Sequence, residues 1–196
     1  DIINQTDSVE DIDGEDKLGQ PMLNLNLLRN WGTLSLFVLP GFRERPFADD
    51  DARRRGPLRI DVDNPSYESG AEDGHVDYAL RWSHTVGNWD IGVSNFYGTS
   101  REARLLPYFQ LNRGLRLRPR YDIINQAGID IQYTKEAWLW KLEAISRWGH
   151  GDQFFAAVGG VEYTFFGVQE SAVDVGVLME LQLDGRDEDG SAPFTT

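Results

Sequence analysis

Two residues whose types and spacing could do chemistry stand close together, His75 and Asp77. Residues two apart in a strand share a face, so an imidazole and a carboxylate would lie side by side, as in a general acid–base pair. One interpretation is a hydrolase that uses both residues. The other is a polar pair at the start of a strand, which is several times commoner for such a spacing. We therefore expect no enzymatic activity.

No other catalytic or cofactor motif accompanies this pair. His150 has no second His at a metal-binding spacing. The acidic run Asp49–Asp51 lacks the alternating oxygen ligands and the closing Glu of a calcium loop, and is more simply solvated or paired with Arg53–Arg55. The chain has no Cys, and it contains no G-x-S-x-G, P-loop or dinucleotide fingerprint. We predict neither a metal nor a cofactor.

A second set of charged residues alternates with apolar residues in the C-terminal half. In Ala137–Trp148, for example, Trp138 and Trp140 fall on one face of a strand, and Lys141 and Glu143 fall on the other. Charged side chains that share one face of neighbouring strands suit the lining of a channel, where they would set the preference for ions or solutes. The candidates for this lining are Asp130, Lys141, Glu143, Arg147, Glu162, Asp174 and Glu180.

The elements that must position these residues are long strands. About eight segments alternate with a period of two: Gly19–Asn30, Thr33–Arg43, His75–Val86, Trp89–Tyr97, Tyr121–Thr134, Ala137–Trp148, Gln153–Phe165 and Ser171–Asp184. Globular strands usually have about five or six residues, whereas strands that cross a membrane need roughly nine to eleven. With no helical pattern, the sequence predicts an all-β, antiparallel up-and-down meander in a single domain, 1–196.

The connections between these segments differ in length. The turns after the first, third, fifth and seventh segments are short, and Gly87-Asn88 has the chemistry of a hairpin turn. Residues 46–74 and 99–120 form long loops, in which Leu105–Gln110 could be a short strand. Pro40 cannot donate a backbone hydrogen bond to a β-ladder, so we expect a bulge or an edge strand there. Short turns at one end and long loops at the other are typical of outer-membrane barrels.

Composition narrows the classes of partner. The formal net charge is −13 over 196 residues, which argues against nucleic acid or an anionic lipid surface. Hydrophobic residues make up 40% of the chain, and no apolar run approaches the ~18 residues of a membrane helix. A spanning barrel alternates, however, so its hydropathy resembles that of a soluble protein. The acidic segment Asp1–Lys17 is not a signal peptide.

Two features favour a membrane barrel, with outer-membrane lipid and small solutes or ions as partners. From His75 onwards, the apolar faces of the segments carry no Asp, Glu, Lys or Arg. Aromatic residues collect near the strand ends, as at a lipid interface. Those beside the short turns are Trp31, Trp89, Tyr133, Trp138, Trp140, Phe165 and Phe166, and those near the other end are Phe42, Tyr97, Trp148, Phe154 and Phe155. The alternative is a soluble, lipocalin-like barrel or a sandwich, binding a small apolar ligand.

Four pieces of the sequence resemble uncharacterised, porin-like outer-membrane β-barrel proteins of Gram-negative bacteria. They are Trp82–His84, Phe96–Glu102, Trp138–Ala144 and Val158–Phe165. The resemblance spans most of the chain. It implies a location in the outer membrane and a barrel architecture, but it implies no substrate and no catalytic residues. Members of that group are longer than this chain.

The direction of the strands leads to one further expectation. If the short turns are periplasmic, both Asp1–Asp16 and Gly185–Thr196 fall on the outer side, whereas a complete barrel keeps both ends on the periplasmic side. We therefore expect further strands at each end, giving a barrel of about ten or more. The edge segments Gly19–Asn30 and Ser171–Asp184 would then be unpaired in this chain, which invites pairing between copies as a homo-oligomer.

Overall fold

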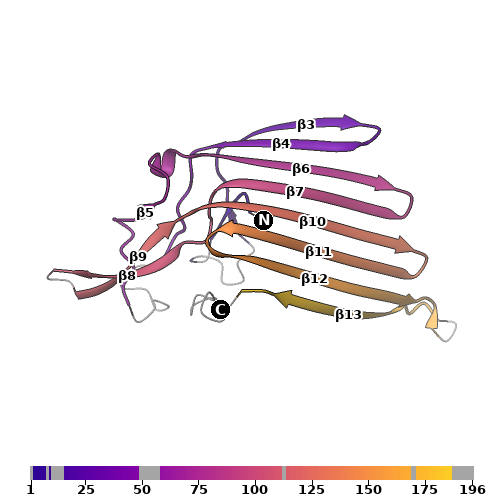
Figure 1. Ribbon diagram of the computed structural model, residues 1–196. Coiled ribbons are helices and arrows are strands. Elements are labelled where there is room, and N and C mark those ends of the chain that lie inside the picture. Colours follow the sequence, from indigo (N-terminus) through magenta and orange to yellow (C-terminus); the bar gives the residue numbers. More distant parts are fainter. Residues whose placement is uncertain are drawn as a thin grey trace. The chain divides into compact units, whose positions relative to one another are not determined.

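The protein is all-β, as predicted (Figure 1). The computed structural model describes residues 2–7, 9, 16–48, 58–111, 114–168 and 171–186. The helical element η1 (Glu72–Gly74) is a single 3-10 turn. Contacts group the chain into unit 1, residues 1–23, 37–79 and 96–124, and unit 2, residues 24–36, 80–95 and 125–196.

The main element is an antiparallel meander of eight strands, in the order β13-β12-β11-β10-β7-β6-β4-β3. Its strands are β3 (Leu23–Arg29), β4 (Gly32–Pro40), β6 (Val76–Val86), β7 (Trp89–Thr99), β10 (Ile123–Lys135), β11 (Trp138–Gly149), β12 (Gly151–Phe165) and β13 (Val175–Asp184). Strands β3, β4, β6, β7 and β10 each have residues in both units. The eight predicted strands are thus confirmed, with shifted ends.

The alternation in sequence becomes two chemically different faces of the sheet. Between β12 and β13, Tyr163 pairs with Val177, and the next position pairs Glu162 with Leu178. Because successive side chains leave opposite sides of a strand, Tyr163 and Val177 lie on one side, which we call the apolar face. Glu162 lies on the other side, which we call the polar face.

The described sheet does not close on itself. Strand β3 pairs only with β4, and β13 pairs only with β12, so that both are edges of an open sheet among the described residues. The closed barrel considered from the sequence is therefore not seen. Pro40 is the last residue of β4, and β4 lies between β6 and β3. Pro40 therefore stands at the end of a strand and not on an edge of the sheet.

Two strand ends differ from the predictions. The second strand ends at Pro40 rather than Arg43, and Phe42 turns away from the apolar face to become 8% exposed, with its ring 4.8 Å from that of Tyr121. The last strand begins at Val175 rather than Ser171, because the preceding residues close a connection.

Short turns and long loops are less clearly divided between the two ends of the strands than predicted. β11 and β12 are separated by one residue, His150, and the flanking Gly149 and Gly151 adopt φ values of +95° and +80°, which suit glycine. The connection between β12 and β13 instead spans residues 166–174. The expected contrast of short turns at one end and long loops at the other is therefore incomplete.

Unit 1 contains secondary structure that was predicted as loop. Strand β8 (Arg104–Gln110) confirms the short strand suggested at Leu105–Gln110, and β9 (Gly114–Tyr121), which was not predicted, pairs with it and with β5 (Ser66–Tyr67). Strands β1 (Gln5–Thr6) and β2 (Lys17–Leu18) form a small separate ladder. Leu39, Phe96, Tyr121 and Ile124, each at most 2% exposed, form the centre of this unit.

Candidate functional site

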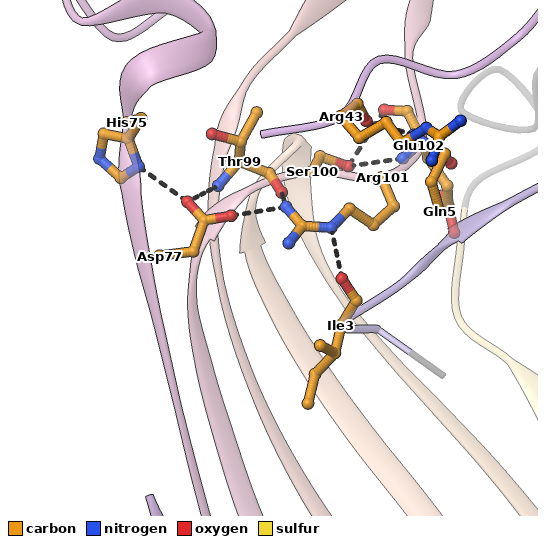
Figure 2. A network of polar contacts seen from close by, with 9 residues as sticks. All are labelled: Ile3, Gln5, Arg43, His75, Asp77, Thr99, Ser100, Arg101 and Glu102. Atoms are coloured by element: carbon orange, nitrogen blue, oxygen red, sulfur yellow. Dashed lines mark hydrogen bonds and ion pairs between the residues drawn. The ribbon is translucent and has the colours of Figure 1, made fainter. Parts of the chain in front are cut away.

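The His75–Asp77 pair predicted from the sequence exists and belongs to a polar network in unit 1 (Figure 2). His75 follows η1 and Asp77 is the second residue of β6. Their Nδ1 and Oδ1 atoms lie 2.8 Å apart. The same Oδ1 accepts a hydrogen bond of 2.9 Å from the backbone N–H of Thr99. The other oxygen, Oδ2, accepts one of 2.6 Å from Arg101.

Arg101 is the centre of this network. It also donates to the carbonyls of Ile3 and Thr99, at 2.9 and 2.7 Å, and its guanidinium lies 5.2 Å from the ring centres of both Phe42 and Phe96. Its side chain is 7% exposed and that of Asp77 is fully buried. Burial lowers the pKa of Arg101, and the bond with Asp77 opposes that shift.

A glycine makes room for this ion pair. A Cβ atom on Gly98 would lie 2.3 Å from Cγ of Asp77, a separation that real Cβ contacts do not reach. Gly98 is on β7, the strand next to β6. The absence of a side chain there lets the Asp77 carboxylate reach Thr99 and Arg101.

The arrangement suits an ion pair with a structural role better than a hydrolytic centre. Both oxygens of Asp77 are occupied by donors. The nearby Ser100 hydroxyl donates to the Glu102 carbonyl at 3.0 Å, and no serine contacts His75 among the described hydrogen bonds. The Asp77 carboxylate therefore holds Arg101, and through it the carbonyl of Ile3.

The predicted lining residues fall mainly on the polar face of unit 2. Lys141 and Glu143 of β11, Glu162 of β12 and Glu180 of β13 surround a shallow hollow of about 170 Å³. In register, Gly160 lies between Lys141 and Glu180, so that no side chain separates these two charges across β12. The hollow also contains the apolar side chains of Leu139, Val158 and Leu178.

Asp130 belongs to the same face but is paired. Its two carboxylate oxygens accept from Arg81 at 2.6 and 2.8 Å. The pair crosses β7 at Gly92, where a Cβ atom would lie 2.3 Å from Asp130 and 2.5 Å from Arg81. Both side chains are about two-fifths exposed, at 43% for Arg81 and 39% for Asp130.

Two predicted lining residues behave differently. Arg147 lies on the polar face, but it is 9% exposed, donates to Gln126 at 2.7 Å and stacks on Phe154. The placement of Asp174 was wrong. It precedes β13, and its carboxylate accepts a hydrogen bond of 2.9 Å from the backbone N–H of Gly167. Asp174 therefore closes the connection from β12 instead of lining the sheet.

The apolar face of unit 2 is exposed and rich in aromatic rings. Trp89 and Tyr133 lie 4.5 Å apart between ring centres, and Tyr163 lies 4.6 Å from Trp138 and 4.7 Å from Phe165. These rings confirm the cluster predicted beside the short turns. The predicted second cluster is only partly present, because Phe42 is buried in unit 1 and Phe154 lies on the polar face.

Sequence reasoning missed Arg101 and Asp122 as ion-pair centres. Asp122 is 2% exposed, forms an ion pair with Arg104 at 2.6 Å and accepts a hydrogen bond from Arg120 at 2.7 Å. Arg104 and Arg120 are direct cross-strand partners in β8 and β9, where like charges repel. Asp122 neutralises that repulsion. The only signal in the sequence was the abundance of Arg in this stretch.

The described residues offer no metal site, since no three His, Cys, Asp or Glu side chains gather closely enough to hold an ion there. The runs Asp49–Asp51 and Arg53–Arg55 lie outside the described residues.

No helix among the described residues is long and apolar enough to cross a membrane.

No protein-family model, no curated protein and no solved structure matches this chain.

Proposed function

We propose that the eight-stranded sheet belongs to a β-barrel in the outer membrane of a Gram-negative bacterium, where it forms a passive channel. The observation that carries this proposal is the apolar face of unit 2. On β13 alone, Val177, Met179 and Leu181 are 55%, 69% and 66% exposed. Soluble monomers rarely leave such a contiguous apolar surface in water, whereas lipid would cover it.

The charged residues of this face support the same orientation. Within the eight strands, the apolar face carries only two, Arg29 and Lys135, and each is the last residue of its strand, beside a two-residue turn. Long basic side chains at strand ends can extend to the water interface. The neighbouring aromatic cluster suits the same depth, because Trp and Tyr favour membrane interfaces.

The polar face would line the channel. In unit 2 its strands carry more acids than bases. The acids are Asp90, Asp130, Glu143, Glu162, Glu180 and Asp184, and the bases are Arg81, Lys141 and Arg147. Rings and clusters of carboxylates favour cations in a pore, so we expect a preference for small cations over anions.

The free edges of β3 and β13 need partners in such a barrel. They would pair with each other, with further strands or with the edges of a second copy. The mass of the detergent-solubilised particle distinguishes one copy from a homo-oligomer.

Single-channel recording in planar bilayers tests the proposal. We expect ohmic conductance with a cation preference that falls when Glu143, Glu162 and Glu180 are replaced together by Gln. The matched control is Met179→Leu on the apolar face, which should leave the reversal potential unchanged. A protein that inserts into the bilayer and stays insulating would contradict the channel.

A further inference from the structure

The hairpin of β8 and β9 in unit 1 has an unusual charge for this chain. The whole chain has a formal net charge of −13, yet no Asp or Glu occurs between Glu102 and Asp122. Arg104, Arg116, Arg118 and Arg120 lie on these two strands. The hairpin is therefore a local basic surface on an acidic protein.

The register divides the hairpin into two faces. Arg104 pairs with Arg120, Leu106 with Arg118 and Tyr108 with Arg116. We call this side the arginine face. The opposite side is apolar, and its members are Leu105, Pro107, Phe109, Leu115, Leu117 and Pro119.

The apolar side changes from buried to exposed along the hairpin. Leu117, nearer the base, is 8% exposed and packs within unit 1. Toward the tip, Phe109, Leu111 and Leu115 are 73%, 80% and 52% exposed. The packing of unit 1 thus accounts for the base of the hairpin, but it leaves the apolar tip uncovered.

The arginines of the hairpin differ in their anionic partners. Arg104 and Arg120 are neutralised by Asp122. Arg116 lies close enough to the buried Asp61 carboxylate to lower the pKa of that group. Arg118 forms no ion pair with any described residue, and its Nε atom is buried without a hydrogen-bond partner. Arg116 is 9% exposed, and the guanidinium of Arg118 lies 4.5 Å from the ring centre of Tyr108. The Arg118 guanidinium therefore lacks a carboxylate partner among the described residues.

We propose that the β8–β9 hairpin docks on an anionic phospholipid, with Phe109 and Leu111 among the acyl chains and Arg118 at the phosphate. The planar fork of Arg matches the oxygens of a phosphate group. An exposed apolar tip next to basic residues is also the usual composition of elements that bind anionic lipid surfaces. The inference goes beyond the channel and does not depend on it.

A fluorescent label at the tip tests this docking on the full chain. Because the chain has no Cys, Leu111→Cys provides a single attachment site for an environment-sensitive dye. The labelled protein in neutral detergent micelles is titrated with phosphatidylglycerol or with phosphatidylcholine. We expect a blue shift with both lipids, and half-saturation at about tenfold less phosphatidylglycerol.

Two variants separate the contribution of the charge from that of the apolar tip. Arg118→Gln should remove the preference for phosphatidylglycerol. Phe109→Ser, at a position that is 73% exposed, should weaken the response to both lipids. Arg186→Gln, in an ion pair with Asp184 of unit 2, is the matched control and should change neither. Equal responses to the two lipids would overturn the proposal. The proposal would also be overturned if inorganic phosphate competed with the lipid and Phe109→Ser responded like the unsubstituted protein. That result would indicate a site for free phosphate.

Discussion

The two units use the polar side of the same strands in different ways. In unit 1 the side chains on that side are buried: Asp77 and Leu39 are fully buried, and Phe96 is 2% exposed. In unit 2 the corresponding ion pair of Arg81 and Asp130 remains about two-fifths exposed. The Asp77–Arg101 pair of unit 1 lies beside Gly98 of β7, and the Arg81–Asp130 pair of unit 2 lies beside Gly92 of the same strand.

The difference shows that alternation alone does not determine what a face does. In unit 1 the other elements of the unit cover the polar side, so its charges must be matched by fixed partners. In unit 2 the charges reach solvent and can interact with solutes, while the apolar side is left uncovered. The polar side therefore has the properties of a structural core in unit 1, and in unit 2 it has those of a channel lining.

The largest expected difference between the units comes from removing one cation of each pair. Arg101→Ala would leave the buried Asp77 uncompensated, which typically costs about 3–5 kcal/mol. Arg81→Ala breaks a partly exposed pair and should cost about 1 kcal/mol or less. Hydrogen exchange at the Thr99 amide, which donates to Asp77, reports on unit 1. All six Trp lie in unit 2, so Trp fluorescence in urea reports on that unit. Equal losses of stability in Arg101→Ala and Arg81→Ala would contradict the comparison between the units.

The two glycines sharpen the comparison. In Gly98→Ala the new methyl would meet Cγ, Oδ1 and Cβ of Asp77 at 2.3–2.5 Å, and Asp77 is held by three partners. We expect a loss of about 1–3 kcal/mol, as for other overpacked sites. In Gly92→Ala the methyl meets the ends of Asp130 and Arg81, which can move, so the loss should be smaller. Urea unfolding of both variants measures this, and a larger loss for Gly92→Ala would contradict it.

A smaller effect concerns alkaline pH in unit 1. Burial raises the pKa of Tyr121 to about 12, against about 10 in an unfolded chain. Because the folded state favours the neutral phenol, its contribution to stability is complete below pH ~10 and is lost as the pH rises through ~12. Tyr121→Phe loses the hydrogen bond from the Arg45 N–H, but it should flatten the fall in melting temperature between these pH values. Parallel curves for the two proteins would argue against this account.

Much of the fold was predictable because one face of each strand is apolar. The strand predicted at Ala137–Trp148 appears as β11 (Trp138–Gly149), and His75 and Asp77 meet because they are two residues apart on extended chain. β9 was missed although Leu115 and Leu117 alternate with arginines, because the many Arg of residues 99–120 suggested a loop.

The partners of the charged residues were not predictable. Arg101 meets Asp77 across 24 positions of sequence, and the contact depends on the pairing of β6 with β7 and on the space at Gly98. Asp174 was misplaced because the alternation of Val173 and Val175 continues past the start of the strand. Only its hydrogen bond with Gly167 shows that it closes a connection.

The central claim is that the apolar face of unit 2 lies in lipid, and two arginine substitutions on adjacent residues of β13 test it most directly. Val177 lies on the apolar face and is 55% exposed. Gly176 lies on the polar face, where a Cβ would be 3.6 Å from a Glu162 carboxylate oxygen. In lipid vesicles, Val177→Arg should lower the free energy of unfolding by about 2–4 kcal/mol, and Gly176→Arg should change it little. Equal tolerance of both substitutions would contradict the account.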